Sequence, residues 1–182
     1  MSAAGTHEEV APSLGEAYWA GEQALIATAS RWTILRMNYY AESMAEEIKM
    51  SLGTGVLAGL GEERVAYVSR DDVAAAAAGV LLSDGHAGAT YNLTGPAVIT
   101  GEERAAALSE VLQQSVNYVR ITVEQLRAGL VQAGLPEPIV DALTEIKTTF
   151  VEGKFDIVTG DVERLSGRAP KSLRAVLVAE LA

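Results

Sequence analysis

The stretch Arg31-Trp-Thr-Ile-Leu-Arg36, followed by Met37-Asn-Tyr-Tyr40, decides the fold class of this chain. Residues 31–36 are short, aromatic and β-branched, which is typical of a buried strand. Apolar residues at helical spacing flank them and predict helices over residues 16–29 and 39–50. Within residues 16–29, one side carries Trp19, Leu25 and Ile26, and the other carries Glu16, Glu22 and Gln23. A strand between two helices indicates an α/β chain.

The alternation of helix and strand continues to the end of the sequence. Further strands are expected at 64–69, 90–94 and 116–121, and further helices at 73–82, 100–114, 122–134, 136–150 and 172–181. Thr100 and Thr122 each begin a capping box, which marks the first turn of a helix. Asp72 is expected to cap the alanine-rich helix. The glycines of residues 53–61 predict a loop with a tight hairpin, and residues 1–12 predict a second loop.

Composition and charge exclude several classes of partner. The 182 residues contain 24 acidic and 14 basic side chains, and the formal net charge is −10. Nucleic acid and anionic membrane surfaces both require a basic face, so neither is an expected partner. The longest apolar run, Val73–Leu82, is shorter than the roughly 18 residues of a membrane span. We therefore expect a soluble protein without a secretory signal.

The residues that could bind metal or form disulfides are scarce. The chain has no cysteine, which excludes disulfides and thiolate zinc sites and is typical of a reducing, cytoplasmic compartment. His7 and His86 are far apart and have no second ligand at metal-binding spacing, so they are interpreted as loop histidines. We predict no metal site.

A candidate binding site follows the strand at residues 31–36. In an open α/β sheet, ligands bind in the crevice beyond the carboxyl ends of the strands. Asn38, Tyr39 and Tyr40 lie at that end and supply an amide and two flat apolar walls, which suit a planar ring. The alternative is that the two tyrosines begin the next helix and pack on the sheet.

Several short motifs, in order along almost the whole chain, resemble one family. They are Glu22-Gln-Ala-Leu25, Trp32-Thr-Ile-Leu-Arg36, Val68-Ser-Arg-Asp-Asp-Val-Ala-Ala75, Gly85-His-Ala-Gly-Ala-Thr-Tyr-Asn-Leu-Thr-Gly95, Gly134-Leu-Pro136, Phe155-Asp-Ile-Val-Thr-Gly-Asp161 and Leu165-Ser-Gly-Arg168. Together they resemble the NmrA-like branch of the atypical short-chain dehydrogenases, and most closely its NAD(P)H:quinone oxidoreductase type 2 subgroup.

The resemblance implies an α/β fold with an incomplete Rossmann-like sheet and a C-terminal α/β substrate-binding lobe. Residues 1–50 would be the trailing part of the NAD(P)-binding domain. Residues 51–182 would form mainly the substrate lobe, with strand 90–94 returning to the main sheet. The family's Gly-rich loop for the dinucleotide pyrophosphate has no counterpart in these 182 residues, so the chain would correspond to the C-terminal part, with the strand before Ser2 gone.

The resemblance also assigns site residues. Ser2 would occupy the family's catalytic serine position, and Tyr18 would lie near its catalytic tyrosine. Glu22 stands where a lysine usually follows that tyrosine. Met37, Asn38 and Tyr39 would lie against the nicotinamide of NADP or NAD, and Tyr40 would contact the substrate.

The implied function is hydride transfer from NAD(P)H to a quinone or similar planar carbonyl acceptor, impaired in this chain alone. Two alternatives remain open. The chain could be a non-catalytic, NAD(P)-linked redox sensor or regulatory module. It could also be one half of a split protein, completed by a second chain or by self-association through an exposed sheet edge.

Overall fold

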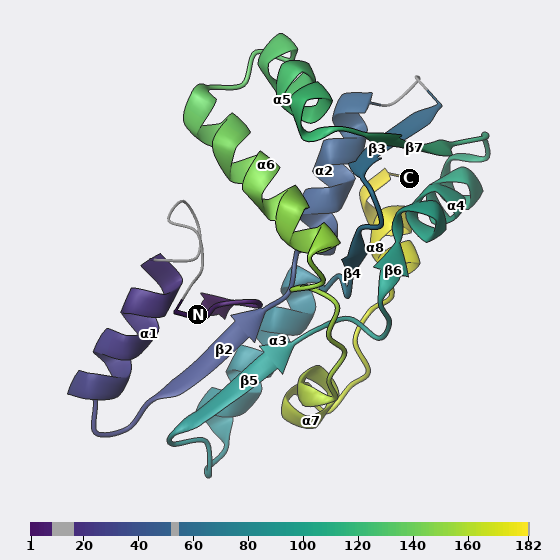
Figure 1. The fold of residues 1–182 in the computed structure, drawn as a ribbon. Coiled ribbons are helices and arrows are strands. Elements are labelled where there is room, and N and C mark those ends of the chain that lie inside the picture. Colours follow the sequence, from purple (N-terminus) through teal and green to yellow (C-terminus); the bar gives the residue numbers. More distant parts are fainter. Residues whose placement is uncertain (9–16, 52–54, 182) are drawn as a thin grey trace.

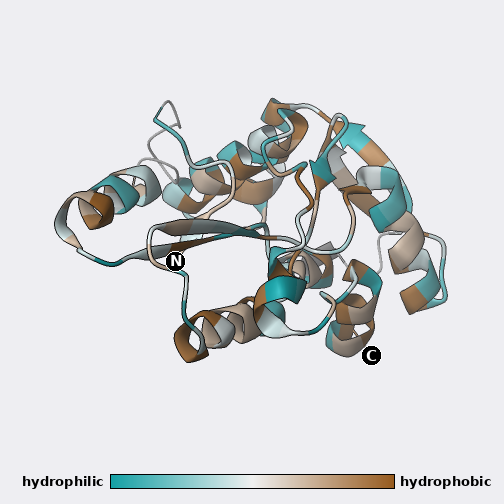
Figure 2. Ribbon diagram, turned by 90° about the horizontal axis from the view of Figure 1, so that it is seen from below, coloured by the Kyte–Doolittle hydropathy of each residue, from teal (hydrophilic) through white to brown (hydrophobic). Residues whose placement is uncertain are grey.

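The computed structural model describes residues 1–8, 17–51 and 55–181 of the chain (Figure 1). Its main sheet consists of three parallel strands in the order β1 (Ser2–Ala3), β2 (Thr33–Met37) and β5 (Ala89–Leu93). Helices lie on both faces of this sheet, which Figure 2 shows edge-on. The parallel sheet between helices confirms the α/β, Rossmann-like fold class.

The alanine-rich helix α3 (Arg70–Leu82) covers one face of the main sheet together with α7 (Asp161–Ser166). Ala76 of α3 is fully buried beside Val73, and Val162 of α7 is buried in the same cluster. Small side chains on α3 let the two helices approach each other and the sheet closely. The alanine run is therefore a packing surface.

A second lobe contains two short sheets. One pairs β3 (Val56–Leu60) in parallel with β7 (Asn117–Ile121), and the other pairs β4 (Arg64–Val65) with β6 (Ile99–Thr100). The helices of this lobe are α2 (Ala41–Ser51), α4 (Gly101–Leu112), α5 (Val123–Gln132), α6 (Glu137–Val151) and α8 (Leu173–Leu181). Buried side chains of α2, α4, α6 and α8 meet in one core around Met44, Leu108, Phe150 and Leu177, whereas α5 has no buried residue.

The strand β3 corrects the expectation of a hairpin loop in this region, of which residues 52–54 lie outside the described part. Gly59 lies within β3, where a Cβ atom would be 2.5 Å from the hydroxyl oxygen of Tyr118. The glycine at this position makes room for a side chain from the neighbouring strand β7. It therefore serves strand packing here and makes no turn.

Three further expectations about local structure need correction. Ser2–Ala3 form a strand, whereas a loop was expected at the start of the chain. Residues 161–166 form α7, a helix too short to be recognised from periodicity. Ser69, rather than Asp72, caps α3, and its hydroxyl accepts a hydrogen bond from the Asp72 amide at 3.0 Å. The capping boxes at Thr100 and Thr122 are confirmed.

Helix α1 (Ala17–Thr28) is oriented differently from the prediction. Leu25 and Ile26 are exposed, whereas Glu22 is buried. Both carboxylate oxygens of Glu22 accept hydrogen bonds from the Arg36 guanidinium on β2, at 2.9 and 2.6 Å. A bidentate pair of this kind offsets the desolvation of a buried carboxylate, so an ion pair docks this helix.

Replacing Glu22 with Gln is expected to destabilise the chain by about 1–2 kcal/mol at neutral pH. Burial by itself would raise the pKa of Glu22, but hydrogen bonding from Arg36 and Ser2 outweighs it and lowers the pKa. The pair therefore contributes stability above the unfolded pKa of about 4.3, and this contribution disappears as the pH falls through the lower folded value.

Urea unfolding at neutral and at strongly acidic pH measures this difference. Gln23→Ala, a change at an exposed position on the same helix, is the control. A difference between wild type and Glu22→Gln of the same size at both pH values would contradict the role of the ion pair.

None of the described helices combines the length and apolar composition that crossing a bilayer requires.

Candidate functional site

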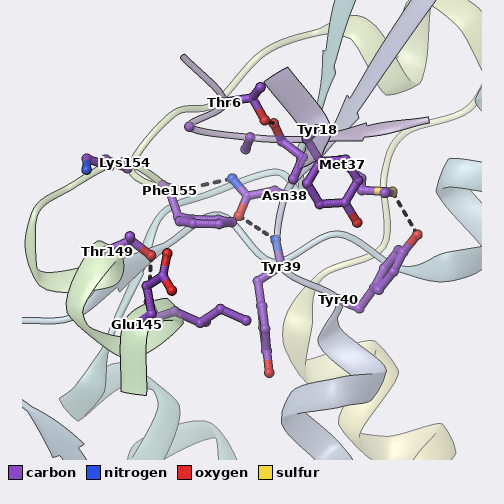
Figure 3. Close-up of a pocket in the computed structure, with 14 residues that line it drawn as sticks. Thr6, Tyr18, Met37, Asn38, Tyr39, Tyr40, Glu145, Thr149, Lys154 and Phe155 are labelled. Carbon is purple, nitrogen blue, oxygen red and sulfur yellow. Dashed lines mark hydrogen bonds between the residues drawn. The ribbon is translucent and has the colours of Figure 1, made fainter. Parts of the chain in front are cut away.

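A cavity of about 170 Å³ lies where β1 and β2 end (Figure 3). It is bounded by the loop after β1, helix α1, the segment after β2, helix α6 and the chain that follows α6. The lining residues are Ala3, Ala4, Gly5, Thr6, Tyr18, Met37, Asn38, Tyr39, Tyr40, Glu145, Ile146, Thr149, Lys154 and Phe155. This is the crevice at the carboxyl edge of a parallel sheet, where α/β proteins bind ligands.

Asn38 joins two distant segments at the base of the cavity. Its side chain is almost fully buried. The Nδ2 group donates to the carbonyl of Phe155 at 3.0 Å, across 117 positions of sequence, and Oδ1 accepts from the Tyr39 amide at 2.7 Å. Asn38 therefore positions Phe155 against the end of β2, in addition to lining the cavity.

Tyr39 presents its ring to the cavity and its hydroxyl to the protein. The hydroxyl donates to Glu47 at 2.5 Å, and Lys147 donates to the other oxygen of that carboxylate at 2.6 Å. Burial and the nearby charge of Glu47 raise the pKa of Tyr39 well above its ordinary value. The phenol therefore stays protonated at neutral pH, and its ring forms a fixed wall, packed edge-on against Phe150 with 5.1 Å between centroids.

The hydroxyl of Tyr40 is also engaged. It donates to the sulfur of Met37 at 2.9 Å, and the guanidinium of Arg70 lies 5.2 Å from the ring centroid. Tyr18 approaches the same cavity from α1 (Figure 3). Among the described residues, its hydroxyl has no hydrogen-bond partner. Tyr18 is thus the tyrosine best placed to donate to a bound molecule.

Ser2 is not among the residues that line the cavity. It is buried within β1, its hydroxyl lies 3.5 Å from that of Thr6, and it helps to lower the pKa of Glu22. Thr6 lines the cavity instead, although its hydroxyl donates to the Ala3 carbonyl at 2.6 Å. The structure therefore groups Tyr18, Met37, Asn38, Tyr39 and Tyr40, and leaves Ser2 behind them.

The far wall of the cavity was missed in the sequence. Glu145 and Thr149 come from α6, and Lys154 and Phe155 follow it. Phe155 belongs to a motif that carries the family resemblance, and this was the only available signal for the wall. Helical periodicity marks the buried face of α6 but cannot indicate which residues face a ligand.

Two other features of the structure lie outside this candidate site. A hollow of about 400 Å³ lies at the opposite ends of the strands, and none of the predicted site residues lines it. Beside it, the ring of His86 is hydrogen-bonded to Ser83 and Tyr91 at 2.9 and 2.8 Å. Within the described part of the chain, no three side chains of the kinds that ligate metals come together.

Comparison of sequences identifies reductases as relatives. The NAD(P)H azoreductase of Xenophilus azovorans is 29% identical over 157 residues, which are 85% of this chain and 55% of the relative. Quinone oxidoreductase 2 of Escherichia coli is 30% identical over 141 residues, 76% of this chain and 49% of the relative. The chain thus spans about half the length of the curated relatives it matches. No family model matches the sequence.

Solved structures share the fold closely. The NADPH complex of the Escherichia coli NADPH-dependent quinone oxidoreductase is 25% identical, with a TM-score of 0.92 over 100% of this chain and 64% of that one. The NADP(H) complex of a Citrobacter triphenylmethane reductase is 29% identical, with a TM-score of 0.87 over 100% and 64%. The chain is thus homologous to NAD(P)H azoreductase and quinone oxidoreductase 2, and it shares the Rossmann-like fold of the NADPH-dependent quinone oxidoreductase.

Proposed function

We propose that this chain forms the nicotinamide-facing and acceptor-binding side of an NAD(P)H-dependent oxidoreductase that reduces a quinone or similar planar carbonyl compound. One observation carries the proposal: an aromatic-walled cavity lies at the carboxyl ends of the parallel strands. Relatives of this fold are NAD(P)H-dependent reductases, and two of the similar structures contain NADPH or NADP(H).

The cavity fits one end of the cofactor. Its volume of about 170 Å³ is below the 300–1,000 Å³ of typical ligand pockets, so it has room for a single planar ring rather than a dinucleotide. Met37, Asn38 and Tyr39 would hold the nicotinamide ring, and Tyr40 would contact the acceptor. The pyrophosphate needs a glycine-rich loop at a helix N-terminus, and the 182 residues contain no such motif.

When bound, NAD(P)H supplies a hydride to the acceptor. The protein residues then have separate tasks. The rings of Tyr39 and Phe155 exclude water from the reacting pair, and the Asn38 amide fixes the distance between those two walls. Reduction of a carbonyl also consumes a proton, and Tyr18 is the group we assign to donate it. Ser2, buried behind Thr6, supports the loop after β1.

Replacing Tyr18 with Phe tests the assignment. We expect acceptor-dependent NADPH oxidation to fall by roughly a hundredfold, because a positioned general acid contributes at least that much. We expect NADPH binding to change little, as measured by the NMR chemical-shift changes of residues 37–40. Thr28→Val on the same helix is the control. An unchanged oxidation rate in Tyr18→Phe would show that the proton comes from another donor.

A second candidate is a non-catalytic NAD(P)-linked module or one half of a split protein. Among the described residues, the outer edge of β1 has no strand partner, and Leu25 and Ile26 of α1 are exposed. A complementing chain or a second copy would cover both. If NADPH changed the NMR chemical shifts of the cavity residues but was not oxidised with any acceptor, the regulatory module would be favoured. A concentration-dependent gain in activity would favour assembly.

A further inference from the structure

Lys147 is a buried cation that the proposed reaction does not use. It lies on α6, its side chain is only 10% exposed, and its ammonium donates to Glu47 of α2 at 2.6 Å. Neither side chain is among the described residues that line the cavity, although α6 supplies Glu145, Ile146 and Thr149 to its wall. A buried ion pair is a poor source of net stability, because two charges must be removed from water. This pair is therefore better explained by what it holds in place.

The Glu47 carboxylate connects this cation to a wall of the cavity. One oxygen accepts from Lys147, and the other accepts from the Tyr39 hydroxyl at 2.5 Å. A hydrogen bond to an ionised group is roughly twice as strong as one between neutral groups, so the carboxylate anchors the phenol firmly. In Figure 3 the Tyr39 hydroxyl lies at the end of the ring remote from Asn38. The bond therefore fixes the ring from its far end and leaves the ring itself to face the cavity.

Lys147 keeps the Glu47 carboxylate turned inward. The side chain of Glu47 is 24% exposed, so a rotation about its side-chain bonds would bring the carboxylate into water. Attraction to a buried ammonium opposes that rotation, and this attraction is stronger than it would be in water. Burial by itself would lower the pKa of Lys147, but the neighbouring acidic groups, chiefly Glu47, outweigh it and raise the pKa. Lys147 therefore stays charged at neutral pH, and the carboxylate stays beside the Tyr39 hydroxyl.

The same cation supports a second aromatic wall. The Lys147 ammonium lies 5.8 Å from the centroid of the Tyr39 ring and 5.1 Å from that of Phe150. Phe150 is fully buried and packs edge-on against both Tyr39 and Phe155, with 5.1 and 5.2 Å between centroids. Edge-to-face packing and cation–π attraction each favour one arrangement of these rings. Tyr39 and Phe155, which both line the cavity, are thus joined through Phe150 and Lys147.

We propose that Lys147 is a positioning residue of the cavity, which holds the Tyr39 and Phe155 rings in the orientation that accepts one planar ring. It acts on Tyr39 through the Glu47 carboxylate and on Phe155 through the Phe150 ring. This inference rests on the proposed function and deepens it, because it assigns the geometry of the site to a side chain outside the cavity. Removing the charge of Lys147 would loosen two walls while every lining residue stays the same.

Two NMR measurements on the folded chain test this proposal without turnover. The first is the Cζ resonance of Tyr39 without ligand, identified by its disappearance in Tyr39→Phe, which reports the bonding of the attached hydroxyl. The second is a titration with NADPH, followed by the chemical-shift changes of residues 37–40. Lys147→Met keeps an apolar side chain of similar length and removes the charge. We expect it to move the Tyr39 resonance and to weaken NADPH binding roughly fivefold.

A double-variant cycle shows whether the effect passes through the Tyr39 hydroxyl. Tyr39→Phe removes that hydroxyl and is expected to weaken NADPH binding about as much as Lys147→Met does. Adding Lys147→Met to Tyr39→Phe is expected to weaken binding by no more than a further factor of about two, since both changes remove the same anchor. Lys49→Met, which breaks an exposed ion pair with Glu46 on α2, is the control and should change neither measurement.

Because Lys147→Met leaves the Glu47 charge unpaired, a second variant covers the case in which it does not fold. Glu47→Leu/Lys147→Met removes both charges together, which usually preserves folding, and is expected to change both measurements in the same way. An unchanged Tyr39 resonance in both variants, or fully additive effects in the cycle, would overturn the positioning role, while NADPH-induced shifts in wild type would still support the proposed function. If NADPH shifted no resonance of wild type but the Tyr39 resonance moved in Lys147→Met, the proposed function would be wrong and only the anchoring of Tyr39 would stand.

Discussion

Replacing Glu63 with Ala is expected to destabilise the chain by about 3–5 kcal/mol, the usual cost of leaving one partner of a buried ion pair uncompensated. The side chains of Glu63 and Arg104 are each only 1% exposed and are hydrogen-bonded to each other. The other oxygen of Glu63 accepts from the Leu60 amide at 2.7 Å, and Arg104 also donates to the Tyr67 hydroxyl at 3.1 Å. Without the Glu63 carboxylate, the Arg104 guanidinium would lose its ion-pair partner and the Leu60 amide would lose its hydrogen-bond partner, both in the core.

Urea unfolding monitored by circular dichroism measures this loss, which is a large fraction of the 5–15 kcal/mol of a typical domain. Glu63→Gln keeps the bond from Leu60 and removes only the charge, so a smaller loss is expected. The double variant Glu63→Leu/Arg104→Met removes both charges and is expected to recover most of the stability. A loss below about 1 kcal/mol in Glu63→Ala would contradict the buried pairing.

Replacing Asn38 with Ala is expected to impair both folding and ligand binding. The partly buried Tyr39 amide would lose its hydrogen-bond partner, whereas the Phe155 carbonyl would keep the hydrogen bond that it accepts from the Ala66 amide at 3.1 Å. Such a loss costs about 1–3 kcal/mol, and we expect a destabilisation of that size. Because Phe155 would no longer be tied to the end of β2, NADPH-induced shifts at residues 37–40 should weaken as well.

Asn38→Asp separates the two bonds. Aspartate still accepts from the Tyr39 amide but cannot donate to Phe155, and its carboxylate would face a carbonyl oxygen. We therefore expect the wall at Phe155 to be displaced in both variants, whereas the start of α2 stays intact only in Asn38→Asp. If Asn38→Ala lost ligand binding at unchanged unfolding free energy, Asn38 would be a ligand-contacting group without the positioning role.

Local sequence was a reliable guide wherever a feature depends on neighbouring residues. Thr100 and Thr122 could be recognised as helix caps because the capping residue and its partner are three positions apart. The strand at residues 33–37 and the site residues that follow it could be predicted for the same reason. Tyr39 and Tyr40, for which two interpretations were open, serve both: their rings line the cavity and their hydroxyl groups are held by the protein.

Features that depend on distant residues could not be predicted. Gly59 suggested a turn because nothing nearby reveals that Tyr118 packs against it. Glu22 suggested a solvated helix face because its partner, Arg36, lies on the next strand. In both cases the residue has a different structural role from the predicted one, because it contacts a side chain from another element of the fold.

The sequence by itself determined the α/β class, the position of the carboxyl edge of the sheet and the family resemblance, because each depends on local pattern or on short motifs in order. Only the tertiary structure decided what faces that edge. It places Glu145 and Phe155 in the same cavity as Asn38, leaves Ser2 outside that cavity, and buries Glu22 in an ion pair with Arg36. The physical reason is that packing and charge pairing join residues far apart in the chain, and no local periodicity records those contacts.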